Sequence, residues 1–229
     1  MKKKEGIRQL FNDIAPRYDL FNHLSSFNAD KMWRNTAVKS IVDTNNSLNI
    51  LDVATGTADF AIAIAQKTAK NSKIIGIDLA DGMLEVGKQK IKGMPIKLEV
   101  GDAENLKYEN ETFDRVSVAF GVRNFENLPK GLAEMCRVLK KGGKLVILEL
   151  SYPDNHFLIG CYKIYAFKII PILGSQLSGN KGAYEYLPDS ILKFPKPNTF
   201  IPMLKQAGFS NVTHKSFTFG TCRMYVAEK

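Results

Sequence analysis

Cysteine and histidine are both scarce, with three of each among 229 residues. The cysteines are far apart and lack the short paired spacings typical of zinc sites or redox pairs: Cys136, Cys161 and Cys222. The histidines are equally scattered: His23, His156 and His214. The sequence therefore predicts no metal site and buried, reduced thiols, which suit the cytoplasm.

Targeting segments and long apolar runs are also missing from the sequence. The first residues, Met1 to Glu5, are mostly lysine and lead into a mixed polar segment, so we expect no signal peptide. No uninterrupted apolar run reaches the roughly 20 residues that a membrane-spanning helix requires. Hydrophobic residues make up 45% and charged residues 24% of the chain, as in globular proteins. We expect one globular domain with an insertion.

Acidic residues are outnumbered by basic ones, 23 to 32, and the formal charge is +9. Such an excess favours a polyanionic partner, either nucleic acid or an anionic lipid surface. Charge alone does not choose between the two. The lysines are scattered, apart from Lys2 to Lys4, so a solvated basic surface is an equally good explanation.

From about residue 48 onward, short apolar runs alternate with helical patterns, which is typical of a parallel sheet covered on both faces. The expected parallel strands are 49–53, 73–78, 96–100, 113–120 and 143–150, with helices at 58–69, 83–90 and 132–139. A helix over 199–206 precedes two more strands, 211–218 and 221–227, joined by a turn at Gly220. The predicted fold is an α/β sheet of seven strands with an antiparallel hairpin at its end.

Two further segments flank this pattern. Residues 1–47 read as a helical cap, kinked by Pro16 and by an aromatic, turn-forming stretch around residues 18–27. The apolar, aromatic and basic residues from 157 to 170 predict an inserted helix. The expected domain thus comprises the cap, a cofactor-binding core at 48–151, a substrate-side insertion at 152–198, and a C-terminal helix and hairpin at 199–229.

The loop after the first strand is the first candidate for a ligand site, because doubly wound sheets bind ligands where a strand ends. A dinucleotide loop needs three glycines to approach a pyrophosphate, whereas Ala54 and Ala58 here flank only Gly56. This argues against NAD. Asp52 and Asp59 suit a cationic ligand with an ammonium and a sulfonium better than an anionic one.

Acidic residues also end the next two strands. Asp78 stands where a carboxylate accepts both ribose hydroxyls of an adenosine-containing cofactor, and Asp102 could accept from the adenine amino group. Each alone could merely cap the following helix. Their joint occurrence with Asp52 predicts a cofactor site, to which we also assign Leu79 and Met83.

With these residues in place, residues 8–229 resemble the ubiquinone/menaquinone C-methyltransferase (UbiE/MenG) family. An N-terminal signature is matched by Tyr18, Asp19, Asn22, Ser26 and Trp33, with Phe21 and Asp30 where the family has Met and His. A second signature is matched by Arg137 to Lys140, Gly142, Gly143, Glu149 and Ser151, with Lys141 departing from it. The segment Phe120 to Phe125 is similar to the family's Phe-Gly-x-Arg-Asn stretch.

The resemblance implies a class I methyltransferase with a Rossmann-like sheet and S-adenosylmethionine (SAM) as its cofactor. It places Thr57, Asp78, Asp102 and Ala103 in contact with the cofactor, and Ala119 where some relatives carry a contacting serine. It implies C-methylation of demethylmenaquinol in menaquinone biosynthesis. A ubiquinone-precursor quinol is the alternative acceptor.

Carbon methylation is easiest when a quinol hydroxyl next to the reacting carbon loses its proton. Arg123 could stabilise the quinolate or activate a water, and Asn124 could orient that water or the ring. Tyr18 and Asp19 could close over the cofactor. The alternatives are that Arg123 anchors a loop through an ion pair and that Tyr18 is a packing residue.

The quinol's isoprenoid tail would explain the apolar insertion, and Lys163 and Lys168 could hold it against anionic lipid. An interior helix or a homodimer interface is the competing interpretation. An RNA methyltransferase is a more distant alternative, but the Asn/Asp-Pro-Pro-aromatic motif is missing after the fourth strand, where Gly121 to Asn124 stand instead. We therefore expect a cytoplasmic protein, peripheral on the inner face of the membrane, with an isoprenoid quinol as substrate and no nucleic acid partner.

Overall fold

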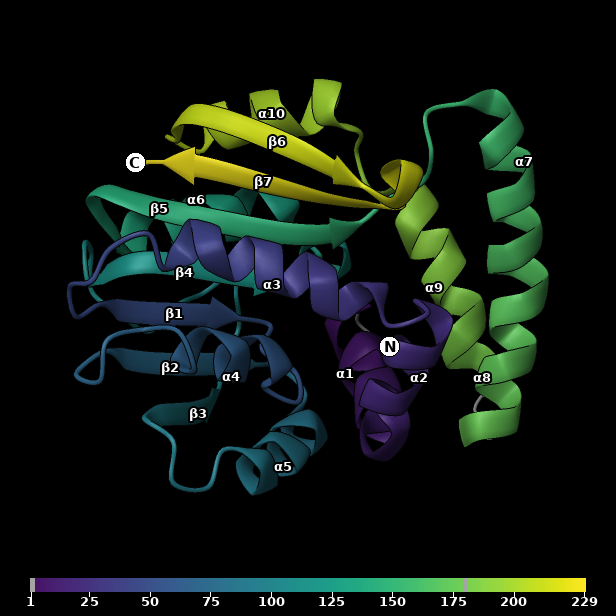
Figure 1. The fold of residues 1–229 in the computed structure, drawn as a ribbon, viewed down its shortest axis with the longest axis horizontal. Helices are drawn as coiled ribbons and strands as arrows, with labels where there is room; N and C mark the ends of the chain where they lie inside the picture. Colours follow the sequence, from purple (N-terminus) through teal and green to yellow (C-terminus); the bar gives the residue numbers. More distant parts are fainter. Residues whose placement is uncertain (1–2, 179–180) are drawn as a thin grey trace.

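A seven-stranded sheet forms the centre of the computed structural model, which describes residues 3–178 and 181–229 (Figure 1). Its strand order is β3-β2-β1-β4-β5-β7-β6. The five parallel strands are β1 (Asn49–Val53), β2 (Lys73–Asp78), β3 (Ile96–Val100), β4 (Phe113–Ala119) and β5 (Leu139–Leu150). β6 (Ser210–Phe217) and β7 (Cys222–Glu228) pair antiparallel, and β7 joins β5. The seven strands and the final hairpin are confirmed.

Helices cover both faces of this sheet. On one face, α3 (Ala29–Ile41) and α4 (Asp59–Ala65) bury Trp33, Ile41 and Ile64 against β1 and β5. On the other, α6 (Leu128–Val138) and α10 (Pro197–Gln206) bury Leu132 and Phe200. α5 (Asp81–Lys90) lies beside β2 and β3. The strand order reverses between β1 and β4, so the loops after these strands open a crevice at their carboxyl ends.

Element boundaries differ from the predicted ones at several ends. β5 begins at Leu139, not at 143, because Leu139 pairs with Phe113 ahead of an irregularity in the ladder. α4 ends at Ala65, and α10 begins at Pro197, a proline at its first turn. The turn between β6 and β7 is a short 3-10 helix, Thr218–Gly220.

Cys161 is exposed, so the prediction of buried thiols is wrong for this residue.

The N-terminal cap is kinked, as predicted. α1 (Lys3–Ile14) gives way to a 3-10 turn at Ala15–Arg17, which contains Pro16, and α2 (Tyr18–Ser25) follows in a new direction. Proline lacks the amide hydrogen that would continue the α-helical hydrogen bonding, so the helix breaks there. α1 and α2 thereby lie against the sheet's carboxyl edge, at the end of the crevice (Figure 1).

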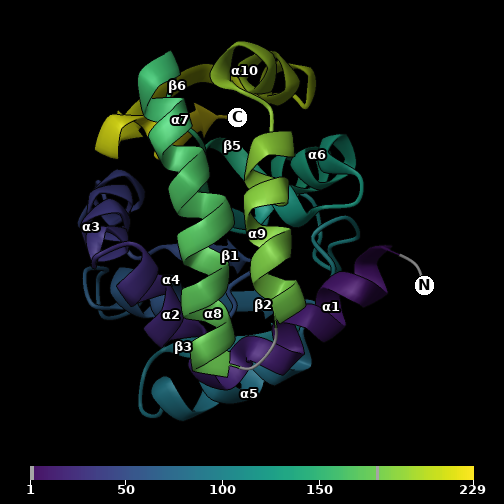
Figure 2. The ribbon, with the colours of Figure 1, turned by 90° about the vertical axis from the view of Figure 1, so that its right-hand side faces the viewer.

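The insertion is more extensive than the single helix predicted for 157–170. α7 (His156–Ile164), a π-helical turn (Tyr165–Ile169) and α8 (Ile170–Ser178) form one continuous column, beside which α9 (Lys181–Lys193) runs (Figure 2). The π-helical turn widens the helix just before Pro171, which lets the chain continue past it. By length and composition alone, the window Phe157–Gly174 could cross a membrane. Lys163 and Lys168 interrupt this window, so the search for an uninterrupted run missed it.

Phe200 tests the packing of α10 on the sheet. Its ring is fully buried, 4.9 Å from that of Phe194 and 4.8 Å from that of Tyr225. Phe200→Ala is expected to lower the free energy of unfolding by about 3–5 kcal/mol, measured by chemical denaturation. The control is Phe219→Ala, which removes an exposed ring. Equal stability of the two variants would contradict the packing described.

Candidate active site

The loop after β1 turns tightly because three of its residues adopt left-handed backbone conformations. Ala54, Gly56 and Ala58 have φ angles of 52°, 57° and 68°. A Cβ atom on Gly56 would lie 3.2 Å from the Cε atom of Met83, so glycine lets the loop approach α5 closely. The Gly56 amide donates to the Asp78 carboxylate at 2.8 Å, which joins this loop to the end of β2.

Asp78 is held in place entirely by backbone donors. Its carboxylate also accepts from the Ala80 amide at 2.8 Å. Burial raises the pKa of Asp78, while the amide hydrogen bonds from Ala80 and Gly56 act in the opposite direction. A carboxylate offers about four acceptor sites, so it retains capacity for the two hydroxyls of a ribose.

A small cavity of about 90 Å³ opens between these loops and the cap. It is lined by seven of the ten residues predicted to contact a cofactor: Gly56, Asp78, Leu79, Met83, Asp102, Ala103 and Ala119. Tyr18 and Asn124, predicted as catalytic residues, also line it. The structure therefore brings the ends of β1, β2, β3 and β4 together at one site.

Asp52 lies beneath the loop and does not line the cavity. It is buried, and its two carboxylate oxygens each accept from a hydroxyl at 2.6 Å, one from Thr55 and one from Ser117. Burial raises the pKa of Asp52 to about 6, although the two hydroxyl hydrogen bonds oppose this rise. The structure thus gives Asp52 a bracing position under the cofactor loop.

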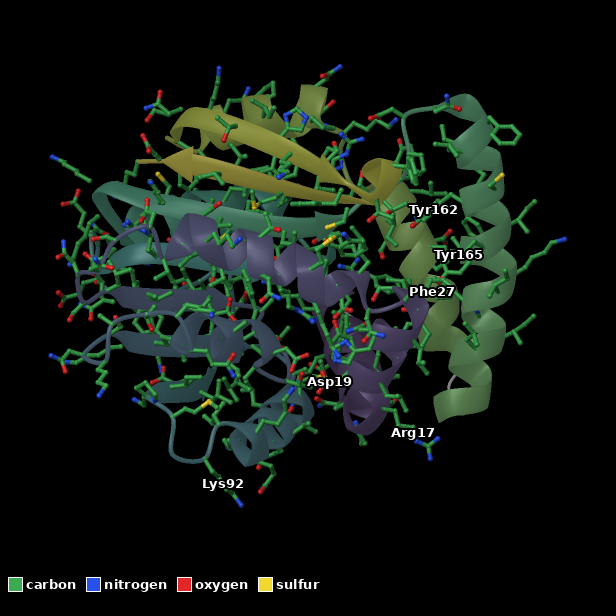
Figure 3. The ribbon with its side chains drawn as sticks, viewed as in Figure 1. Arg17, Asp19, Phe27, Lys92, Tyr162 and Tyr165 are labelled. Carbon is green, nitrogen blue, oxygen red and sulfur yellow. The ribbon has the colours of Figure 1, made fainter. Side chains whose placement is uncertain are left out.

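Thr57, Asp59 and Asp19 also lie outside the lining, where they tie the cap to the loop. The Thr57 hydroxyl donates to Asp19 at 2.5 Å, and Lys90 of α5 pairs with Asp19 at 2.8 Å and with Asp59. Asp59 also lies 3.6 Å from the guanidinium of Arg34 in α3. Asp19 lies on the side of α2 that faces the sheet (Figure 3). It holds the cap closed over the cavity.

Lys4 closes the opposite end of the cavity. Its ammonium pairs with Asp102 at 2.8 Å and with Glu104 at 2.9 Å, and all three residues line the cavity. Sequence reasoning missed Lys4 and Glu104. Lys4 belongs to a basic run that is typical of a solvated surface. Its partners lie at least 98 positions further along the chain, so no sequence spacing relates them to it.

A second, larger cavity of about 290 Å³ lies between the cap and the insertion. Its lining is mostly apolar and aromatic and includes Phe21, Trp33, Leu150, Tyr162, Tyr165, Ile170, Tyr186 and Ile191. Figure 3 shows Phe27 of the cap close to Tyr162 and Tyr165 of the insertion, and the Phe27 and Tyr165 rings are 6.4 Å apart. The two cavities share Phe11, Tyr18 and Phe120, so they meet at these three rings.

Arg123 lies in this larger cavity and forms a buried ion pair. Its guanidinium is 2.7 Å from the Glu149 carboxylate, with 3% and 0% of the two side chains exposed. The other Glu149 oxygen accepts from the Arg123 amide at 3.1 Å, and the guanidinium also donates to the Phe120 carbonyl and to the Ser190 hydroxyl. Burial would lower the pKa of Arg123, but Glu149 raises it above its usual value, so the cation persists. Sequence reasoning used Glu149 only as part of a signature and gave it no role in the site.

Polar side chains surround Arg123. The Tyr186 hydroxyl donates to the Asn124 side-chain oxygen at 3.0 Å. Burial raises the pKa of Tyr18, although the Arg123 charge opposes this rise. Asn22 lines the same cavity, and a hydrogen bond from its side chain to the Tyr18 hydroxyl also opposes the rise in the Tyr18 pKa. In residues 3–178 and 181–229 no group of three His, Cys, Asp or Glu side chains could hold a metal ion.

The fold is that of class I SAM-dependent methyltransferases. A SAM-dependent methyltransferase from Thermotoga maritima superposes with a TM-score of 0.69 at 18% identity, covering 96% of this chain and 99% of that one. A phosphoethanolamine N-methyltransferase from Haemonchus contortus, solved with SAM, gives a TM-score of 0.65 at 15% identity over 86% of this chain and 52% of that one. At such low identities these similarities concern the fold alone.

The chain belongs to the ubiE/COQ5 methyltransferase family, whose model matches residues 1–229. A ubiquinone/menaquinone biosynthesis C-methyltransferase from Geobacter sulfurreducens is 42% identical over all of this chain and 90% of its own length. A demethylmenaquinone methyltransferase from Bacteroides fragilis is 43% identical over all of this chain and 94% of its own length. The protein is therefore a SAM-dependent methyltransferase.

The small cavity fits the cofactor's chemistry. Asp78, Asp102 and Glu104 provide carboxylates that suit a nucleoside with a cationic amino-acid tail, while Leu79, Met83 and Ala103 provide apolar walls. No glycine-rich pyrophosphate loop is built at β1. When bound, SAM supplies an electrophilic methyl group on its sulfonium sulfur, while Asp78 would hold the ribose hydroxyls.

Replacing Asp78 tests this assignment. Asp78→Asn removes the charge and one acceptor oxygen, so SAM is expected to bind at least about tenfold more weakly in calorimetric titration, since a charged hydrogen bond contributes about 1.5–3 kcal/mol. Asp189→Asn, on the exposed surface of α9, is the matched control. SAM affinity equal to that of the control would remove Asp78 from the cofactor site.

The raised pKa of Asp52 predicts a pH dependence of stability. Because the folded pKa of about 6 lies above the ordinary aspartate value of 3.8, the protonated carboxyl stabilises the fold at low pH. This contribution declines as the pH rises from about 4 through 6, by at most about 3 kcal/mol. Relative to Asp52→Asn, the wild-type free energy of unfolding should fall over this window. Parallel pH profiles for the two proteins would contradict the raised pKa.

Proposed function

We propose that this enzyme methylates a ring carbon of demethylmenaquinol, producing menaquinol. The observation that carries the proposal is the junction of the two cavities. An aromatic cavity large enough for a quinol ring meets the SAM cavity at Tyr18, Phe11 and Phe120, with Arg123 beside it. The relatives from Bacteroides fragilis and Deinococcus radiodurans, named demethylmenaquinone methyltransferases, support this acceptor.

The reaction requires an electron-rich ring carbon. When the neighbouring hydroxyl loses its proton, its charge delocalises onto that carbon, which becomes nucleophilic. A new bond then forms between the ring carbon and the methyl carbon, and the electron pair of the sulfur–methyl bond stays on sulfur. The ring carbon afterwards loses its hydrogen as a proton, which restores the aromatic ring, and the quinolate oxygen takes up a proton to give the quinol.

Arg123 stabilises the quinolate oxygen that this path requires. Inside an apolar cavity a fixed cation interacts with a developing negative charge far more strongly than in water. Glu149 fixes Arg123 through two hydrogen bonds, one from the backbone amide and one from the guanidinium, and balances the charge of the guanidinium. The two roles considered for Arg123, anchoring a loop and acting in catalysis, are therefore compatible, because the ion pair with Glu149 serves both.

Four further polar side chains orient the ring. The Asn22 amide lines the larger cavity beside Tyr18 and can donate to the second quinol oxygen. Asn124 and Tyr186 form a hydrogen-bonded pair next to Arg123. Tyr18 lines both cavities at their junction and aligns the ring with the methyl group. The surrounding aromatic rings exclude water, which keeps the quinolate in a medium of low polarity.

The direct test supplies the purified enzyme and SAM with either demethylmenaquinol or a demethylated ubiquinone-precursor quinol, followed by mass spectrometry of the quinones. We expect demethylmenaquinol to gain one methyl group. The name of the Geobacter relative covers both pathways, so the precursor is the alternative acceptor. Methylation of the precursor alone would replace the proposed acceptor, and methylation of neither would refute the proposal.

Substitutions at the ion pair test the role of Arg123. Arg123→Gln is expected to lower kcat by about 10²–10³-fold, the usual loss for one transition-state donor, without weakening SAM binding. It also leaves Glu149 buried and unpaired, which destabilises the fold. The double variant Arg123→Gln/Glu149→Gln removes both charges, so stability recovers while kcat stays low. A double variant with wild-type kcat would show that Arg123 only anchors its loop.

A further inference from the structure

Large apolar side chains are exposed on one side of the molecule, where the insertion meets the cap. Phe27, Phe157 and Phe219 are 82%, 77% and 80% exposed, although a soluble surface rarely presents such rings together. We call the apolar face the exposed residues Phe27, Phe157, Ile164, Phe167, Ile169 and Phe219. They come from three segments far apart in the sequence, and the α7–α8 column forms the outermost part of this side (Figure 2).

The apolar face adjoins the larger cavity. Phe27 both belongs to this face and lines the cavity, and its ring lies beside that of Tyr165, which also lines it. Thr218 and Thr221, on either side of the turn that carries Phe219, line the cavity too. The apolar face therefore reaches the cavity lining at Phe27 and lies next to it at Phe219.

The charges at this face favour an anionic surface. Between residues 155 and 178 the sequence contains Lys163 and Lys168 and no acidic residue. Both lysines are exposed on the column that carries Phe157, Ile164 and Phe167. Long lysine side chains can bury their methylene groups among apolar neighbours while their ammonium groups reach lipid headgroups.

The column is better suited to lie in a membrane surface than to cross it. Only 17% of the window Phe157–Gly174 is buried, yet this part includes Ala166 and also Ile170, which packs onto Ile14 and Phe21 of the cap. Tyr162 and Tyr165 face the cavity. Withdrawing the helix into a bilayer would break these contacts and open the cavity. We therefore expect the cavity-facing side of the column to stay packed on the protein, while its exposed side contacts lipid.

We infer that the apolar face docks the enzyme onto an anionic lipid bilayer, with the cavity mouth against the membrane, so that the quinol ring enters while its isoprenoid tail stays in lipid. This inference rests on the proposed function for the nature of the substrate. A second copy is the competing occupant, but a two-fold contact here would bring the exposed lysines Lys163 and Lys168 of both copies into one interface. It would also cover the mouth through which the tail must leave.

The test measures binding of the full-length enzyme to phosphatidylglycerol-containing vesicles by sedimentation. A lysine near an anionic surface contributes about fivefold to partitioning, so Lys163→Gln/Lys168→Gln should bind roughly 30-fold more weakly. Phe157→Ser/Phe219→Ser should lose at least about tenfold, since it removes two inserted rings. The matched control, Lys67→Gln/Lys70→Gln, removes two exposed lysines after α4 and should bind like wild type.

Methyl transfer to a short-tailed, water-soluble demethylmenaquinol separates this inference from the proposed function. The phenylalanine pair lies outside the cavity lining, so this activity should match wild type, while activity on vesicle-bound, long-tailed quinol falls. Absence of vesicle binding by the wild type, or wild-type binding by both pair variants, would overturn the docking inference. The inference would also be overturned if the pair variants converted a dimeric enzyme to a monomer and left vesicle binding unchanged. Failure to methylate even the soluble quinol would instead refute the proposed function.

Discussion

The buried ion pair between Arg123 and Glu149 is the interaction on which the rest of the site depends. Removing two charges from water costs several kcal/mol per ion unless each is closely paired and hydrogen-bonded. Glu149 meets this requirement by accepting from both the backbone and the side chain of Arg123. The pair fixes the loop after β4 at the point where two cavities meet. A permanent cation is thereby held in an apolar space.

The cap completes the site that the sheet edge begins. Lys4 reaches Asp102, and Asp19 reaches Thr57 and Lys90, so polar contacts at two places hold α1 and α2 over the cofactor cavity. The same segment supplies Tyr18 and Asn22 to the larger cavity. One segment therefore encloses the cofactor and shapes the substrate cavity.

The sequence predicted the sheet well because its strands are short apolar runs separated by clear helical patterns. It also located Asp78 and Asp102, since carboxyl ends of neighbouring parallel strands must share one edge. Spacing could not distinguish a carboxylate facing the cavity from one beneath the loop, so Asp52 and Asp59 were grouped with Asp78. Contacts between distant segments leave no local signal in the sequence. Only the fold therefore revealed Lys4 and Glu104 at the cofactor cavity and the pairing of Glu149 with Arg123.

The central claim is that a quinol ring binds at the junction of the two cavities, with one oxygen beside Arg123. A crystal structure with S-adenosylhomocysteine and a short-tailed demethylmenaquinol tests this most directly. The account predicts a ring oxygen in hydrogen-bond contact with the Arg123 guanidinium, and the reacting carbon about 3–3.5 Å from the position of the transferable methyl group. A ring bound away from Arg123, or separated from the cofactor by the Tyr18 side chain, would contradict it.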